Sequence, residues 1–191
     1  MPRTGNARRR FPSPLLGLLL LIAGFVGAVA AYGATEPPVG WDAGERPELG
    51  DKIQQMIAER SLAVTITEAE LNALVAESLY PERRLSEYAE VTGAAVSLEG
   101  DTLVARTDVA IAGAIRVPLT HRLKLEWQAP DVIATHRSTS FKDIPLPATW
   151  FPIGVVRVPL RLDERLPAEI ADVQFEDGGI RLQFRLRNPF L

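Results

Sequence analysis

The chain has 191 residues, of which 47% are hydrophobic, and it contains no cysteine. This composition excludes a disulfide-stapled miniprotein, a cysteine-ligated zinc or iron–sulfur domain and a wholly disordered chain. Four of the 21 basic residues and none of the 24 acidic residues precede residue 35, so the remaining 157 residues carry a net charge of −7. Because nucleic-acid-binding surfaces are basic, we expect no nucleic-acid partner.

A basic tail, residues 1–14, is followed by an apolar block, residues 15–34, in which all 20 residues are hydrophobic or glycine. As a helix this block is about 30 Å long, which matches the hydrocarbon thickness of a bilayer. Arg8, Arg9 and Arg10 precede the block and Glu36 follows it, a distribution that keeps the N-terminus in the cytoplasm. We predict a single-pass protein of the inner (cytoplasmic) membrane with an extracytoplasmic, periplasmic domain.

The same segment also fits a cleaved signal sequence. Ala28-Val29-Ala30 is an acceptable cleavage site, and the preceding tail is suitably basic. Both interpretations send the domain to the same side of the membrane.

Residues 35–47 contain three prolines and two glycines and predict a short linker, so the domain, residues 48–191, is expected to lie close to the membrane. Apolar residues at helical spacing predict a helix over 48–60. The run 62–66 predicts a short strand.

A second helix begins after Thr67. Thr67 and Glu70 match the capping box, in which each side chain accepts a hydrogen bond from the other residue's backbone. Pro81 is expected to end this helix. Its predicted apolar stripe consists of Leu71, Leu74, Val75 and Leu79.

From residue 91 onward the dominant period is two, which is typical of half-buried antiparallel strands. The longest alternation, residues 115–127, puts His121 among the apolar positions and Pro118 on the polar face, which suggests an edge or a bulge. Further strands are predicted over 91–98, 102–112, 132–141, 170–176 and 180–187. Residues 142–167 contain five prolines and fit either an edge strand near 156–162 or a short helix near 148–153.

The predicted strands are much longer than the predicted helix. A 13-residue strand spans about 43 Å, whereas 12 helical residues cover about 18 Å. Two such helices can cover most of the apolar face only if they lie end to end. Otherwise the sheet must coil strongly, pair with a second copy or leave an apolar trough uncovered. The residues expected along the trough are small, which allows either close helix packing or a cavity: Ala105, Ala110, Ala112, Gly113 and Ala114.

Catalytic chemistry is sparse in this sequence. We expect His121 to be a core or rim histidine bonded to backbone, and no third ligand joins it and His136, so we predict no metal and no cofactor. Nothing pairs a nucleophile with a base and an orienting group, so we predict that the protein is not an enzyme.

The run Val64–Leu74 resembles a motif of small bacterial envelope proteins, in which a short strand precedes S/T-E-x-E-L-N and a helix. The chain over about 60–191 is similar to the YpmS-like and YceB-like proteins of the tubular lipid-binding (TULIP-like) superfamily. The single N-terminal apolar segment, the long strands, the closing pair around Asp177-Gly178-Gly179 and the loop Ile144–Pro147 agree with this resemblance.

The resemblance implies an α+β domain with a long, strongly curved antiparallel sheet wrapped around one or two helices, preceded by a single N-terminal transmembrane helix. It also implies an apolar groove that binds a lipid or fatty-acid chain, with a structural hydrogen bond for Asn72.

We therefore expect a membrane-anchored lipid-binding module in envelope lipid transport or homeostasis. The alternative is a non-enzymatic envelope scaffold whose apolar sheet face is buried against a partner or a second copy. The expected lipid-binding residues are Leu71, Leu74, Val109, Ile111, Leu119, Leu123, Leu125, Leu182 and Phe184.

Overall fold

The computed structural model describes residues 24, 26–28, 30–41, 52, 56, 61–151, 153–160 and 168–186. The chain divides into two compact units, Met1–Glu36 and Pro37–Leu191. In the first unit, the described residues between Gly24 and Gly33 are helical. Among the described residues, no helix combines the length and the apolar character needed to span a membrane. The expected tail 1–14, most of the block 15–34 and most of the helix 48–60 lie outside the described residues.

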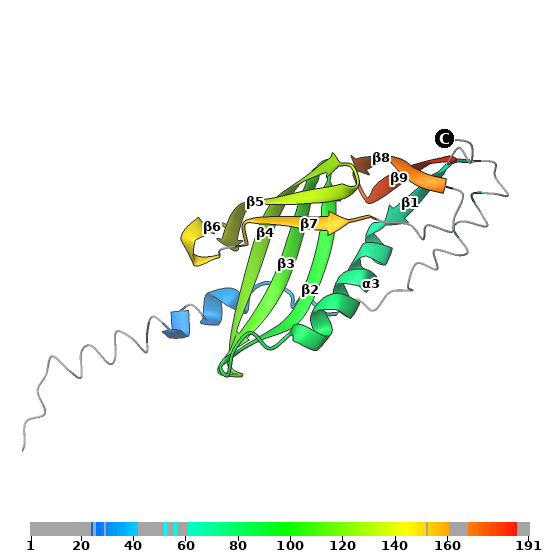
Figure 1. Cartoon of the computed structure of the whole chain (residues 1–191). Coiled ribbons are helices and arrows are strands. Elements are labelled where there is room, and N and C mark those ends of the chain that lie inside the picture. The colour runs from blue at the N-terminus through cyan, green and yellow to red at the C-terminus, as the bar shows by residue number, and fades with distance from the viewer. Residues whose placement is uncertain are drawn as a thin grey trace, which may run out of the picture. The chain divides into compact units, whose positions relative to one another are not determined.

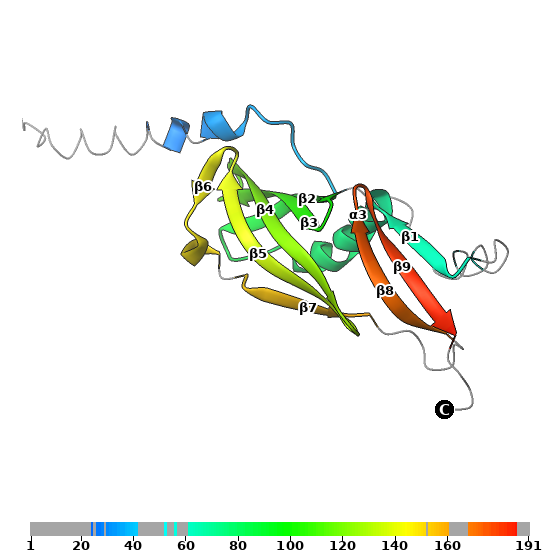
Figure 2. The ribbon, with the colours of Figure 1, turned by 90° about the horizontal axis from the view of Figure 1, so that it is seen from above.

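The second unit is an α+β domain, as the sequence predicts, but its strands form two antiparallel sheets (Figures 1 and 2). The larger sheet has the order β2-β3-β4-β5-β6, with β7 also paired to β5, and the smaller has the order β1-β9-β8. The larger sheet contains β2 (Ala89–Glu99), β3 (Thr102–Ile111), β4 (Ile115–Gln128), β5 (Asp131–Phe141), β6 (Ile144–Leu146) and β7 (Val155–Pro159). The smaller contains β1 (Ala63–Thr67), β8 (Ala168–Glu176) and β9 (Gly179–Leu186).

The strands predicted from alternation are present within a few residues of the expected bounds. The proline-rich stretch 142–167 contains both alternatives, since a 3-10 helix, η2 (Ala148–Trp150), precedes β7. Pro118 lies at a local edge of β4, because the pairing of β4 with β5 begins one residue later, at Leu119. At this position a missing N–H removes no ladder hydrogen bond on the β5 side.

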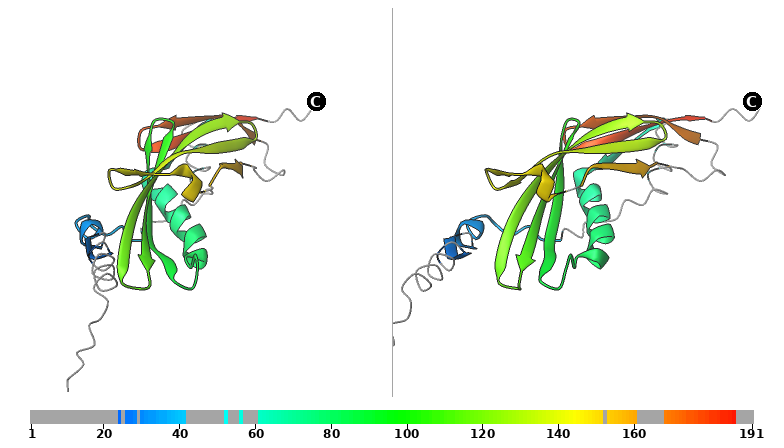
Figure 3. Two further views of the ribbon diagram at one scale, coloured as in Figure 1. Left: turned by 90° about the vertical axis from the view of Figure 1, so that its left-hand side faces the viewer. Right: turned by 60° about the vertical axis from the view of Figure 1, so that its left-hand side comes forward.

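Helix α3 (Glu68–Leu79) begins at Thr67 with both bonds of the predicted capping box. The predicted apolar stripe is wrong in part, because Leu74 and Leu79 are 41% and 42% exposed. The buried positions of α3 are instead Asn72, Ala73 and Ala76. Small side chains on this face let the helix lie close against β2 (Figures 1 and 3). Leu74 and Leu79 are left exposed.

The free edge of β2 is paired with a side chain of α3. The amide Nδ2 of Asn72 donates to the carbonyl O of Val96 at 2.9 Å, and Asn72 Oδ1 accepts from the Val96 N–H at 2.6 Å. One amide side chain thereby satisfies both edge-facing backbone groups of a buried residue, as a neighbouring strand would. The structural role expected for Asn72 is confirmed.

The next edge positions of β2 are met by groups that join the two sheets. Glu68 Oε1 accepts from the Leu98 N–H at 2.7 Å, and the Glu68 N–H donates to the carbonyl O of Gly178 in the β8–β9 turn at 3.1 Å. Asp177 Oδ1 in the same turn accepts from the Gly100 N–H at 2.7 Å. The start of α3 is therefore the joint between the sheets.

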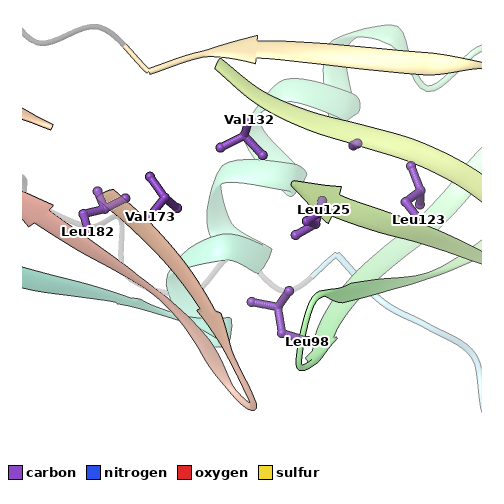
Figure 4. Close-up of a cluster of buried hydrophobic side chains, with 7 residues drawn as sticks. Leu98, Leu123, Leu125, Val132, Val173 and Leu182 are labelled. Carbon is purple, nitrogen blue, oxygen red and sulfur yellow. The ribbon is translucent and has the colours of Figure 1, made fainter. Parts of the chain in front are cut away.

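The main hydrophobic core fills the space beside this joint (Figure 4). It combines side chains of β2, β4 and β5 with side chains of the smaller sheet. Its buried members are Leu98, Leu123, Leu125, Val132, Ala134, Val173 and Leu182.

Part of the expected linker 35–47 is docked on the larger sheet. Asp108, only 1% exposed, forms an ion pair with Arg116, and the distance from Arg116 Nε to Asp108 Oδ2 is 2.8 Å. Arg116 Nη2 also donates to the carbonyl O of Pro37 at 2.8 Å, and the Val39 N–H donates to Asp108 Oδ2 at 2.7 Å. A Cβ at Gly93 would overlap the carbonyl O of Val39, so only glycine allows this approach. We call these contacts the linker clamp.

We expect Asn72→Ala to lower the free energy of unfolding by about 2–5 kcal/mol, because it leaves two buried backbone groups of Val96 without partners. Urea denaturation of the full chain in detergent measures this. The matched control is Ser78→Ala on the same helix, which removes only an exposed hydroxyl and is expected to stay within about 0.5 kcal/mol. Equal effects at the two positions would contradict the edge-pairing role.

Candidate functional site

The strand register places one row of mainly apolar side chains on a single face of the larger sheet. Leu103, Ala105, Thr107, Val109 and Ile111 of β3 lie opposite Leu123, His121, Leu119, Val117 and Ile115 of β4. Directly paired residues of antiparallel strands share a face. This face, which we call the apolar face, continues on β5 through Ala134, His136, Thr139 and Phe141.

The structure brings five of the nine expected lipid-binding residues into the main core. Leu123, Leu125 and Leu182 are buried members of it, and the partly buried Leu71 and Phe184 pack against it. These side chains fill the space between the sheets with their own contacts.

The other four expected residues lie elsewhere. Val109 and Leu119 are buried farther along the apolar face, whereas Ile111, at the end of β3, is 41% exposed. Leu74 is exposed on α3. Of the small residues expected along a trough, Ala105 packs against the core, and Ala112, Gly113 and Ala114 form the exposed turn between β3 and β4.

Between the main core and this exposed end, the two histidines of the chain meet at one hydroxyl group. His121 Nδ1 lies 2.9 Å from Thr139 Oγ1, and His136 Nε2 lies 2.8 Å from the same atom. Thr139 is 1% exposed, and the Phe151 ring packs edge-on against the His121 ring at a centroid distance of 5.7 Å. We call His121, His136 and Thr139 the histidine–threonine cluster.

A β-bulge makes this cluster possible. The register of β5 against β4 shifts by one residue, so that Leu123 pairs with His136 and Arg122 pairs with Ser138. In a regular strand His136 and Thr139, three residues apart, would point to opposite faces. The extra residue at the bulge brings both to the apolar face.

The surroundings of His121 favour its neutral form. The Thr139 hydroxyl has one proton, so it can donate to one ring while it accepts from an N–H of the other. Burial lowers the pKa of His121, and the charge of a protonated His136 lowers it further. The ring centroids are only 6.3 Å apart, so two imidazolium charges would repel each other in a poorly hydrated place.

The chemistry that this arrangement offers is hydrogen bonding within an apolar surface. Within the described ranges, no three His, Asp or Glu side chains gather into a set that could hold a metal ion. The alternation in the sequence predicts the correct face for His121, but its Nδ1 lies against the Thr139 hydroxyl and not against the expected backbone group. The only available signal was that both histidines fall on neighbouring predicted strands, and the bulge that joins them to Thr139 has no clear sequence signature.

No protein-family model, curated protein or solved structure matches this chain.

We expect His121 to titrate below the ordinary histidine pKa of about 6.5. The folded state then binds fewer protons than the unfolded state, so the free energy of unfolding falls as the pH drops below about 6.5 and levels off below the folded-state pKa. Histidine NMR titration and urea denaturation between neutral and mildly acidic pH measure the two effects. In His121→Gln the loss of stability on acidification should be smaller. An NMR pKa of His121 at or above the ordinary value would contradict the neutral state inferred for this ring.

Proposed function

We propose that this protein is a membrane-anchored, extracytoplasmic lipid-binding module that holds an acyl chain against its apolar face. In this proposal the block 15–34 is a single-pass anchor or signal sequence. The resemblance to tubular lipid-binding proteins is part of the same proposal. The module is not an enzyme and transfers its ligand passively.

The observation that carries the proposal is that the apolar face extends beyond the main core. Toward the β3–β4 turn, Ile111 is exposed and its neighbours Ile115 and Val117 are only half-buried. Val109 and Leu119 form the buried floor beside them. Exposed apolar surface next to a packed core is typical of a binding site for an apolar ligand.

Ligand binding at this end would be driven by burial of methylene groups, each contributing about 0.8 kcal/mol when it leaves water. Leu123, Leu125 and Leu182 already bury their side chains against one another, so they are the wall behind the proposed site. The residues proposed to touch the chain are therefore Ile111, Ile115 and Val117, with the buried Val109 and Leu119 as the floor beneath them. The histidine–threonine cluster lies next to Leu119 and is the nearest polar group for the ligand's polar end.

We expect native mass spectrometry of the full chain, extracted from membranes in mild detergent, to show bound lipid, and we expect the protein to take up a fluorescent fatty acid. Val117→Arg places a cation on the apolar face and should weaken this uptake about tenfold or more, which corresponds to about 1.4 kcal/mol.

The matched control is Thr120→Arg, which adds the same side chain to the opposite face of the same strand and should leave uptake unchanged. Ligand-free protein together with no fatty-acid uptake by the unaltered chain would overturn the lipid-binding proposal.

A second candidate function, an envelope scaffold or interaction protein, is favoured by a strip of exposed apolar side chains near β7. Trp150 is 65% exposed, and the other members of this strip belong to β6, to β7 or to the segment between η2 and β7. Within β7, Val155 lies on one face and Val156 and Val158 lie on the other. Its members are Ile144, Trp150, Ile153, Val155, Val156 and Val158. Large exposed apolar patches commonly mark protein–protein contacts.

If this strip joins two copies, analytical ultracentrifugation of the full chain in detergent should show a concentration-dependent dimer. Val155→Lys should abolish the dimer, because it places a charge in the middle of the strip. Lys142→Ala, which removes a charge near the strip, should not abolish it. A monomer at all concentrations would exclude self-association as the role of the strip.

A further inference from the structure

One hairpin turn of the larger sheet differs from the others in chemistry. The β3–β4 hairpin ends in Ile111-Ala112-Gly113-Ala114-Ile115, which carries no polar side chain, and residues 111–114 are exposed. Tyr88 joins it, because the Ala112 N–H donates to the carbonyl O of Tyr88 at 2.7 Å. Tyr88 and nearby Leu85 are 66% and 61% exposed. We call Leu85, Tyr88 and residues 111–115 the apolar tip.

The other hairpin turns among the described strands all carry charged residues. They are Glu99-Gly100-Asp101, Gln128-Ala129-Pro130-Asp131, Lys142-Asp143 and Glu176-Asp177-Gly178. The charged turns are well hydrated, whereas exposure of the apolar tip to water is unfavourable.

The backbone of the apolar tip contains two left-handed positions. Ala112 has a φ of 51° and Gly113 a φ of 69°, and the Ala114 N–H donates to the carbonyl O of Ile111 at 3.2 Å. Left-handed positions of this kind are usually filled by Gly, Asn or Asp. Ala112 therefore places an exposed methyl group at a position where glycine, asparagine or aspartate is usual.

The linker clamp shows at which end of the sheet the N-terminal part of the chain leaves the domain. Trp41 lies beside Ala94, which pairs with Thr107. Val39 is bonded to Asp108, and Pro37 is bonded to Arg116, which pairs with Ala110. Because Trp41 pairs with β2 in parallel, the chain from Trp41 back to Pro37 runs toward the start of β2, where Ala89 pairs with Ile111 beside the β3–β4 turn.

Only a few residues of sequence separate the linker clamp from the apolar block 15–34. The block ends at Ala34, three residues before Pro37, and three residues span at most about 11 Å. From Arg116 to the middle of the turn at Gly113 the strand rises about 10 Å. The clamped Pro37 and the end of the block are therefore separated by only three residues of chain.

We propose that the apolar tip inserts into the interfacial layer of the bilayer that holds the block 15–34. The proposal rests on the exposed apolar tip, the direction of the clamped linker and the length of chain before it. This inference rests on the membrane anchor of the proposed function. Apolar and aromatic side chains at the lipid boundary are stabilised by buried apolar area. The nearby charged residues Glu82, Arg83, Arg84 and Glu87 comprise two of each sign, so the contact does not depend on anionic lipid.

The contact deepens the proposed function, because it places the exposed end of the apolar face at the lipid surface. Ile111 and Ile115 belong to both the apolar tip and the proposed site. An acyl chain would then pass from bilayer to site without crossing water.

The absence of cysteine allows a direct test. Ala114→Cys and Asp101→Cys each carry a single label in exposed turns at opposite ends of β3, about 33 Å apart. The full chain, labelled with an environment-sensitive fluorophore, is reconstituted into phosphatidylethanolamine–phosphatidylglycerol vesicles with or without lipids that carry a nitroxide near the head group. We expect emission at 114 to shift to shorter wavelength and to be quenched several-fold more strongly than emission at 101.

A second variant tests the apolar character without risk to the turn. Ala112→Asp fits the left-handed position but adds a charge, so it should remove the quenching at 114 while the thermal unfolding of the chain remains cooperative. Persistent quenching in this variant would overturn the inference. Equal, weak quenching at 114 and 101 in the parent would also overturn it.

Vesicle flotation after an alkaline wash distinguishes the two proposals. A chain that floats with the vesicles but shows no quenching at 114 keeps its anchor and refutes only the tip contact. A chain that does not float refutes the anchor, and the tip contact with it. Lipid uptake by Val117→Arg is measured separately and does not depend on either result.

Discussion

The unpaired edge of β2 is the constraint on which the rest of the domain depends. Its backbone groups need hydrogen-bond partners, and they are met by Trp41, by Asn72 and Glu68 of α3, and by the β8–β9 turn. Because Asn72 must reach Val96, α3 presents its small residues to the strand and turns Leu74 outward. Because Glu68 must also hold Gly178, the smaller sheet is fixed beside the same edge, and the core closes between the two sheets.

A buried carboxylate has a similar effect on the linker. Asp108 is buried among strands, where an unpaired charge would cost several kcal/mol, so Arg116 lies against it. The same guanidinium reaches Pro37, and the carboxylate accepts from Val39. A segment whose prolines and glycines predict a simple linker therefore becomes, in part, a component of the domain. In the proposed arrangement this shortens the tether and sets which end of the sheet faces the membrane.

The sequence predicts the apolar face well and the candidate site only in part. Alternation over residues 115–127 places Leu119, Leu123 and Leu125 on one face because successive side chains of a strand point to opposite sides. It does not tell which of them are covered: Leu123 and Leu125 are buried together with side chains of the smaller sheet, whereas Ile111 remains exposed. The histidine–threonine cluster could not be predicted, because it depends on a one-residue bulge in β5.

What the sequence determined by itself are the properties that arise over a few residues. These are the capping box at Thr67, the alternating strands, the polar and apolar turns and the long apolar block. The tertiary structure alone decided which apolar side chains form the core, which edge α3 protects and which polar groups meet. Those outcomes depend on contacts between residues far apart in the chain, such as Asn72 with Val96 and Arg116 with Pro37. Such contacts follow from strand register and packing, and no local pattern in the sequence encodes them.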